Sequence, residues 1–253
     1  MAQYIFGKNT IMTRLHKGED IEEVLISSHF NDARFINLFD SMKVTRVSDS
    51  ELDRLTGGAV HQGIVARIKT YEFTSLDKLL KLLNGVSNPL LVMLDGIEDP
   101  HNFGAILRSC EAMGVQGVLV PKHRSAPLNA TVAKVSTGAI EFIPVIQVTN
   151  LTQTIQRLKE KGFWVVGAEA TNANDYREVD YQMPTLLVIG SEGKGISRLV
   201  LEQCDFKVKL PMLGKINSLN ASVATAVLLY QIYNSRFPLN TMGNKKKGDS
   251  LNE

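Results

Sequence analysis

Cysteine is scarce in this 253-residue sequence, which contains only Cys110 and Cys204. The two are far apart and belong to no Cys-x-x-Cys pair, so the sequence predicts neither a disulfide framework nor a zinc cluster. No group of His, Asp and Glu residues has the spacing of metal ligands either. We therefore expect a protein without a bound metal.

Long apolar runs and a strong net charge are also missing. No apolar stretch approaches the roughly 18 residues of a membrane span, and the N-terminus MAQYIFGKNT lacks the layout of a signal peptide. We expect a cytoplasmic protein with no membrane partner. The formal net charge of +2 does not by itself indicate a nucleic-acid binder, and 44% hydrophobic residues are ordinary for a globular protein.

Residues 1–70 have the pattern of a small α/β domain. Three short apolar segments predict strands, and two segments with helical periodicity predict helices. The predicted strands are 23–27, 43–48 and 63–68, and the predicted helices lie near 8–16 and 31–41. Nine Lys and Arg residues balance nine Asp and Glu residues in this domain. Residues 71–89 end in Asn-Gly and Asn-Pro breakers and suit a linker.

From residue 90 onward, near-continuous apolar strands alternate with helical segments. The predicted strands are 90–95, 117–120, 142–148, 163–169, 185–190 and 206–211. This pattern predicts a second α/β domain at 90–238, with a largely parallel sheet covered on both faces. Ligands bind such sheets at the carboxyl ends of the strands. The polar segment 239–253 is predicted to be a disordered tail.

The familiar nucleotide-binding and hydrolase motifs are absent. The turn after the first strand of the second domain reads DGIEDPHNFGAILRS (95–109) and lacks the Gly-x-Gly-x-x-Gly fingerprint of dinucleotide-binding domains. GSEGKGIS (190–197) has Walker A glycine spacing but Ile-Ser where the Lys-Ser/Thr pair is required. No Gly-x-Ser-x-Gly elbow supports a hydrolase.

Polar residues instead gather in three loops at predicted strand ends. Asn102 and Arg108 stand at the start of one predicted helix, and Glu192 stands between glycines. Small polar residues gather at 217–222, around the start of a predicted apolar helix at 219–236. Taken singly, each has an ordinary explanation as a helix cap, a surface residue or a solvated turn. Together they bring an amide, a guanidinium, a carboxylate and a hydroxyl to one edge of a sheet, which indicates a binding or catalytic site.

Three segments carry a resemblance to a known family. LDGIEDPHNFGAILRSCEAMGV (94–115), LVIGSEGKGIS (187–197) and LPMLGKINSLNASVATAVLLYQ (210–231) resemble, in order, the three motifs of the SpoU (TrmH) family of RNA ribose 2′-O-methyltransferases. Segments 58–68 and 120–139 are similar to family members that methylate a guanosine ribose of 23S ribosomal RNA.

The resemblance implies a fold, a cofactor and partners. It implies a SPOUT-type parallel sheet whose C-terminal part forms a trefoil knot, preceded by an L30e-like substrate-binding domain at 1–70. S-adenosyl-L-methionine would be the methyl donor. The partners would be 23S ribosomal RNA and a second copy of the chain in a homodimer.

The resemblance also implies site residues. The positions that match the family's catalytic residues are Asn102, Arg108, Glu192, Ser218 and Asn220, and those that match its cofactor contacts are Gly190, Leu210 and Leu219. A guanidinium is a poor base at neutral pH. We therefore expect Arg108 to stabilise the anion that forms on the ribose oxygen, and Glu192, paired with Asn102, to orient the site.

RNA contacts and alternative functions complete the expectations. Lys122 and Arg124 share the loop PKHRS (121–125) and could bind phosphates, although a solvated basic loop explains them almost as well. One alternative function is a transfer RNA ribose methyltransferase of the same family. Another is a ribosomal-RNA-binding factor without catalysis.

Overall fold

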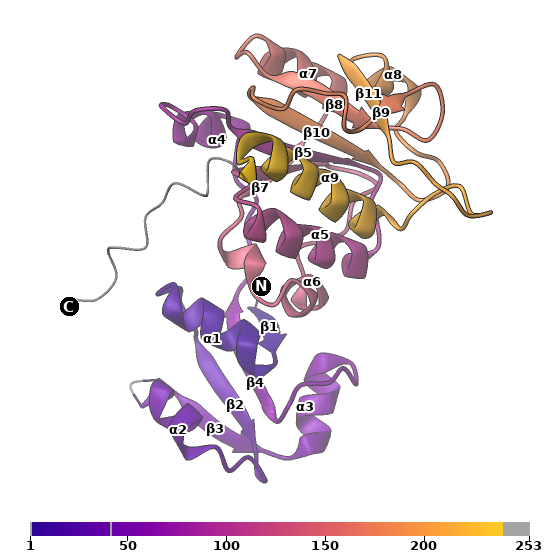
Figure 1. Ribbon diagram of the computed structural model, residues 1–253. Coiled ribbons are helices and arrows are strands. Elements are labelled where there is room, and N and C mark those ends of the chain that lie inside the picture. The colour runs from indigo at the N-terminus through magenta and orange to yellow at the C-terminus, as the bar shows by residue number, and fades with distance from the viewer. Residues whose placement is uncertain (1, 41, 240–253) are drawn as a thin grey trace.

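The computed structural model describes residues 2–40 and 42–239, which form two sheets that each carry their own helices (Figure 1). The predicted tail lies outside the described residues except for Leu239. Among the helices of the described ranges, none is long and apolar enough to cross a membrane.

The first sheet has four strands in the order β1-β4-β2-β3, with β2 and β3 parallel and the other pairs antiparallel. The strands are β1 (Ala2–Phe6), β2 (Glu23–Ser27), β3 (Val44–Val47) and β4 (Ile64–Lys69). The helices are α1 (Lys8–His16), α2 (Ala33–Ile36), the 3-10 turn η1 (Asn37–Phe39) and α3 (Asp49–Thr56). Three strands and α1 agree with the expected segments, whereas β1 and α3 were not predicted.

The second sheet is parallel throughout, with the order β7-β6-β5-β10-β8-β11-β9. Its strands are β5 (Leu90–Asp95), β6 (Gly117–Pro121), β7 (Val145–Val148), β8 (Trp164–Ala168), β9 (Asn174–Asp175), β10 (Thr185–Gly190) and β11 (Phe206–Lys209). The predicted parallel α/β sheet is therefore confirmed. Of its strands, only the two-residue β9 was not predicted.

Helices cover both faces of this sheet (Figure 1). They are α4 (Leu76–Leu82), α5 (Pro100–Ala112), α6 (Ala130–Val135), the 3-10 turn η2 (Ala139–Glu141), α7 (Leu151–Lys159), α8 (Arg198–Leu201) and α9 (Ala221–Arg236). Helices α5, α6 and α9 share one apolar core, and α4, α7 and α8 share the other.

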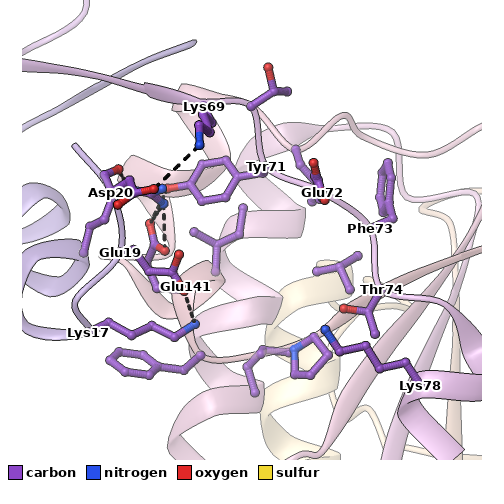
Figure 2. A pocket seen from close by; sticks show the side chains of 18 of the residues that line it. Lys17, Glu19, Asp20, Lys69, Tyr71, Glu72, Phe73, Thr74, Lys78 and Glu141 are labelled. Carbon is purple, nitrogen blue, oxygen red and sulfur yellow. Dashed lines mark hydrogen bonds and ion pairs between the residues drawn. The ribbon is translucent and has the colours of Figure 1, made fainter. Parts of the chain in front are cut away.

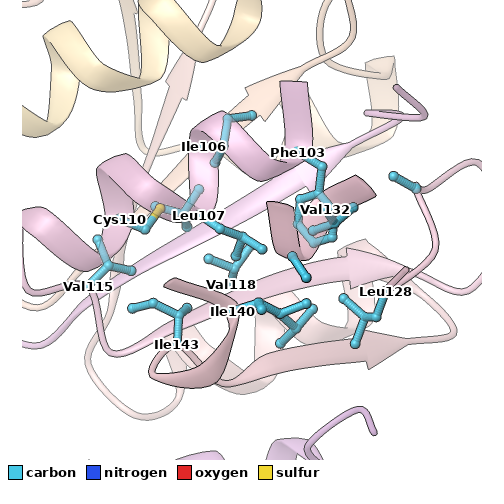
Figure 3. Packing of buried hydrophobic residues seen from close by; sticks show 14 of the residues in the cluster. Phe103, Ile106, Leu107, Cys110, Val115, Val118, Leu128, Val132, Ile140 and Ile143 are labelled. Atoms are coloured by element: carbon cyan, nitrogen blue, oxygen red, sulfur yellow. The ribbon is translucent and has the colours of Figure 1, made fainter. Parts of the chain in front are cut away.

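Strand β5 shows why both faces need a cover. Leu90, Val92 and Leu94 point to the α5 side, while the alternate residues Leu91 and Met93 point to the α7 side, and all are buried. Successive side chains of a strand point to opposite faces, so a continuous apolar run requires helices on both. Figure 3 shows the α5 side, where apolar side chains of α5 and α6 pack together with those of the neighbouring segments.

The order of the strands creates a switch point between β5 and β10. From β5 the chain continues to β6 and β7 on one side, whereas β10 neighbours β5 on the other side and is followed in the sheet by β8. Loops that leave neighbouring strands at such a point separate and leave a crevice, where ligands of open parallel sheets bind. Helix α5, which begins after the loop that follows β5, carries Asn102, and the loop after β10 carries Glu192.

The two sheets are joined by a buried ion pair. Arg14 Nη1 of α1 donates to both carboxylate oxygens of Glu141, at 3.1 and 3.0 Å, and the Tyr71 hydroxyl donates to Glu141 Oε1 at 2.6 Å. Arg14 and Glu141 are both buried. These residues line a cavity of about 710 Å³ between the two units, and Figure 2 shows Tyr71 and Glu141 on its wall. The first unit is thus docked on the second through a specific polar contact.

Candidate active site

The first part of the site is the start of helix α5. The Asp99 side chain caps this helix by accepting from the His101 backbone N–H at 3.0 Å, and Pro100 occupies the first helical position. Proline suits that position because its missing N–H would have no partner there in any case. Asn102 follows in the first turn and projects its amide at the positive end of the helix.

The second part is a tight turn after strand β10. Ser191 and Gly195 exchange backbone hydrogen bonds of 3.1 and 2.9 Å, and Gly193 and Gly195 have positive φ values of 83° and 65°. A Cβ atom on Gly190 would lie 2.1 Å from the Gly195 carbonyl carbon, so only glycine permits this turn. The turn carries Glu192 and exposes it to solvent.

The third part is the start of helix α9, where Asn220 is the N-cap residue. Its Oδ1 accepts from the Ser222 N–H at 3.0 Å, from the Val223 N–H at 3.4 Å and from the Ser222 hydroxyl at 2.6 Å. The amide oxygen therefore satisfies N–H groups that the first helical turn leaves free.

These three parts meet at the Glu192 carboxylate. Its Oε1 accepts from Asn102 Nδ2 at 3.1 Å, from the Ala221 N–H at 3.2 Å and from Asn220 Nδ2. Asn220 Nδ2 also donates to Asn102 Oδ1 at 2.9 Å. Glu192 places its negative charge at the positive ends of both α5 and α9. We call Asn102, Glu192 and Asn220 the amide–carboxylate cluster.

A small cavity of about 110 Å³ lies beside the start of α9. Its walls come from the ends of β8 and β11, from the segment before α9 and from α9 itself. The residues that line it are Ala168, Glu169, Ala170, Val208, Leu210, Met212, Asn217, Ser218, Leu219, Ala224 and Leu228. Three predicted site residues, Leu210, Ser218 and Leu219, thus share this cavity, whereas the predicted cofactor contact Gly190 is not among its lining residues.

Arg108 is not brought to the amide–carboxylate cluster. It lies on α5, six residues after Asn102, and its side chain is exposed. Within residues 2–40 and 42–239 it forms no hydrogen bond or ion pair. Its guanidinium is therefore available to a partner molecule.

The basic loop after β6 lies at the same strand ends. Lys122 and Arg124 are both exposed there. Arg124 Nη2 lies 3.8 Å from the buried carboxylate of Asp95, the last residue of β5. Lys122 is held through its backbone N–H, which donates to the Val148 carbonyl at 2.9 Å.

Two acidic residues near the site were not predicted from the sequence. Asp95 ends β5 and is buried, and Glu169 directly follows β8 and lines the small cavity. Both stand at the carboxyl end of an apolar strand, which is the signal that could have indicated them. In the part of the chain that the structure describes, no group of His, Cys, Asp and Glu residues could hold a metal ion.

Two known protein families match parts of the chain. Residues 89–230 match the SpoU rRNA methylase family, and residues 4–74 match the substrate-binding domain of RNA 2′-O ribose methyltransferases. A TrmH family tRNA/rRNA methyltransferase of Staphylococcus haemolyticus is 46% identical over 240 residues, which cover 92% of this chain and 95% of the relative.

Solved structures have a similar fold. An AdoMet-bound rRNA methyltransferase from Sinorhizobium meliloti aligns with a TM-score of 0.78 and 21% identity, over 92% of this chain and 87% of the other. A TrmH/SpoU tRNA modifying enzyme from A. aeolicus aligns with a TM-score of 0.56 and 32% identity, over 66% of this chain and 85% of the other.

Proposed function

The chain belongs to the SpoU rRNA methylase family, and we propose that it transfers a methyl group from S-adenosyl-L-methionine to the 2′-hydroxyl of an RNA ribose. The observation that carries this proposal is the convergence of Asn102, Glu192 and Asn220 at one sheet edge, beside a small cavity. Three segments far apart in the sequence meet there through polar side chains, which packing alone does not require.

The cavity beside α9 fits part of the methyl donor. Leu210 and Leu219 give it apolar walls, and Asn217 and Ser218 add polar groups. Flat apolar walls with a few fixed polar groups suit a nucleoside. Gly190 contributes to the site through the backbone, because the absence of a side chain lets the turn that carries Glu192 fold back on strand β10. When bound, S-adenosylmethionine would supply an activated methyl group.

The protein's own residues position the ribose and stabilise charge. The ribose 2′-hydroxyl is a weak acid, and negative charge grows on its oxygen as its proton passes to a base, for which we propose a phosphate of the RNA. Arg108 is exposed and unpaired within the described ranges, so its guanidinium can approach that oxygen or a neighbouring phosphate. Glu192 fixes the amides of Asn102 and Asn220 in one orientation. A preoriented cluster of this kind lowers the entropic cost of alignment.

We propose a guanosine of 23S ribosomal RNA as the methylated nucleotide. The support is the N-terminal unit, because residues 4–74 match the substrate-binding domain of RNA 2′-O ribose methyltransferases. We propose that residues 1–70 form this L30e-like domain, which 71–89 joins to the catalytic domain at 90–238. The rRNA methyltransferase structure aligns over 92% of this chain, whereas the tRNA modifying enzyme aligns over 66%. Lys122 and Arg124 would contact phosphates. A transfer RNA substrate is the alternative within the family, and a non-catalytic rRNA-binding factor is the alternative outside enzymes.

A homodimer is also proposed. Around the start of α9 and along it, apolar side chains face solvent, including Ile216 at 74%, Val223 at 48% and Tyr230 at 55% exposure. A second copy of the chain would cover them. Light scattering at micromolar concentration should give twice the chain mass, and a monomer would contradict the proposal. We also propose that the C-terminal part of the catalytic domain forms a trefoil knot and that the protein is cytoplasmic.

The enzymatic proposal is tested with purified protein and labelled S-adenosylmethionine. We expect methyl transfer to 23S ribosomal RNA, with the label on one guanosine ribose, and little transfer to transfer RNA. The reaction should survive a metal chelator, since no metal-binding group exists among the described residues. Preferred transfer to transfer RNA would support the alternative substrate. RNA binding without transfer to either RNA would support the non-catalytic alternative.

A further inference from the structure

Asp95 is a buried carboxylate at the centre of the sheet edge that carries the site. It is the last residue of β5, and its side chain is 2% exposed. Its Oδ2 accepts from the Ser197 backbone N–H at 2.8 Å, and its Oδ1 lies 3.8 Å from Arg124 Nη2. Burial of a carboxylate is costly unless its oxygens have partners. One oxygen of Asp95 therefore holds the loop before α8 by a hydrogen bond, and the other lies within ion-pair distance of the loop after β6.

The first of these loops carries Glu192. Strand β10 pairs with β5 in a register that sets Gly190 opposite Asp95, and the chain leaves the sheet directly afterwards. The chain returns to Asp95 at Ser197, whose backbone N–H donates a hydrogen bond to the Asp95 carboxylate. Residues 191–196 are thus fastened to Asp95 at both ends, by strand pairing at one and by a hydrogen bond at the other. This closure adds to the Ser191–Gly195 hydrogen bonds that shape the turn around Glu192.

The second loop carries the basic residues. Arg124 has a positive φ of 58°, which is uncommon for a residue with a side chain, and 64% of its side chain is exposed. Its guanidinium nevertheless approaches the buried oxygen of Asp95. An ion pair with one buried partner is screened less by salt than a pair on the open surface. The attraction of Asp95 therefore favours positions of the Arg124 guanidinium close to the end of β5.

We propose that Asp95 is a positioning residue for methyl transfer, which fixes the Glu192 turn through one carboxylate oxygen and the Arg124 loop through the other. This inference rests on the proposed function. It makes a single buried side chain set the distance between an RNA-binding loop and the amide–carboxylate cluster. RNA held by Arg124 would then meet Glu192 and its partners in one fixed relation.

Asp205 provides a control with the same kinds of contact, although its side chain is 24% exposed. Its Oδ2 also accepts from a backbone N–H, that of Val165 at 2.8 Å, and its Oδ1 also pairs with a cation, Lys159 Nζ at 2.6 Å. Asp205 immediately precedes β11 and contacts Val165 near the start of β8. It therefore lies at the amino ends of these strands, away from the site. Asp205→Ala removes the same kinds of contact without touching the Glu192 turn.

The experiment measures single-turnover methyl transfer at saturating RNA. Asp95→Ala should lower the rate by at least about tenfold, since misplacement of catalytic groups is costly, while Asp205→Ala should not. Asp95→Asn should recover most of the loss, because an amide oxygen can still accept from the Ser197 N–H. Equal rates for Asp95→Ala and Asp205→Ala would overturn the inference, and so would an Asp95→Asn rate as low as that of Asp95→Ala.

A binding cycle tests the link to Arg124 separately. Arg124→Gln should weaken RNA binding by different factors in the wild-type and Asp95→Asn backgrounds, with a difference of about threefold or more. In the Asp205→Asn background its effect should equal that in the wild type. Equal effects in all backgrounds would overturn the coupling. If the wild-type protein binds RNA but transfers no methyl group, the proposed function fails, and this cycle still decides whether Asp95 couples the loops.

Discussion

The ion pair between the two units gives the sharpest stability prediction. Arg14→Ala removes the guanidinium that donates to both oxygens of Glu141. The Glu141 side chain is only 3% exposed, and the Tyr71 hydroxyl would be its remaining side-chain partner among the described residues. The variant thus leaves a buried carboxylate without a neutralising charge, which is more costly than the pair itself is stabilising.

The size of the effect follows from this burial. Loss of one partner of a buried ion pair costs about 3–5 kcal/mol in the free energy of unfolding. Loss of one hydrogen bond to a charged group costs about 1.5–3 kcal/mol, so Tyr71→Phe should be milder than Arg14→Ala. In a protein of this size each kcal/mol corresponds to about 2–4 °C in Tm. Arg14→Ala should therefore lower the Tm by about 6–20 °C.

Urea unfolding at pH 7, followed by circular dichroism, measures these differences. The exposed pair of Arg54 with Glu51, at 2.6 Å within α3, provides the control, and Arg54→Ala should change the unfolding free energy far less. Replacing Arg14 and Glu141 together by Met and Leu should restore most of the stability, since no unpaired charge remains. A loss below about 1 kcal/mol in Arg14→Ala would refute the reasoning, because a buried pair cannot be broken so cheaply.

The same contact predicts a pH dependence. Burial, together with the neighbouring Glu141 carboxylate, raises the pKa of Tyr71 well above its usual value of 10.0. The folded protein therefore keeps this phenol protonated after the unfolded chain has begun to lose the proton. The resulting stability is fully present below about pH 10 and is lost progressively above it. The stability of Tyr71→Phe should consequently fall less steeply than that of the wild type between about pH 10 and 11.

Three further predictions concern the site and the thiols. Arg108→Ala should lower the single-turnover methylation rate at saturating RNA by roughly 10²-fold, with little rescue by Arg108→Lys, and a normal saturated rate would assign Arg108 to RNA binding. Asn220→Asp should keep the cap of α9 but lower the rate, because a second carboxylate would face Glu192; full activity would refute a role for the cluster. Burial raises the pKa of Cys204 to about 12 and also raises that of Cys110, so a thiol reagent at pH 8 should label both in urea and neither in the folded protein, and rapid labelling of the folded protein would contradict this.

Local patterns were sufficient for the second sheet. Its long strands are apolar on both faces, and this pattern depends on the sheet environment rather than on any single partner. β1 is different, since Ala2–Phe6 has only five residues and becomes a strand by pairing with β4, more than 50 residues later. α3 differs again, because its sequence carries local signals of both ends: Ser48 caps it, and Gly57 ends it in a left-handed conformation.

Long-range polar pairs were beyond prediction. Nothing in the sequence near Arg14 indicates a partner 127 residues away. The local sequence around a charged residue does not tell whether its side chain is buried in an ion pair or exposed to water. Asp95 ends a predicted strand, but its bond to Ser197 depends on β10 lying beside β5. Whether β10 pairs with β5 depends on the order of the strands in the sheet. A sequence in which strands alternate with helices does not determine that order.

The polar segment before α9 shows how one residue can fill two roles that a sequence presents as alternatives. An amide has an acceptor at one atom and donors at the other. Asn220 turns its oxygen to the first turn of α9 and caps the helix, while its nitrogen donates to Glu192 and Asn102. Two residues earlier, Ser218 lines the small cavity instead. The excess of small polar residues beyond what one cap requires therefore has a physical reason, because the same short segment caps the start of one helix, orients a carboxylate and forms a cavity wall.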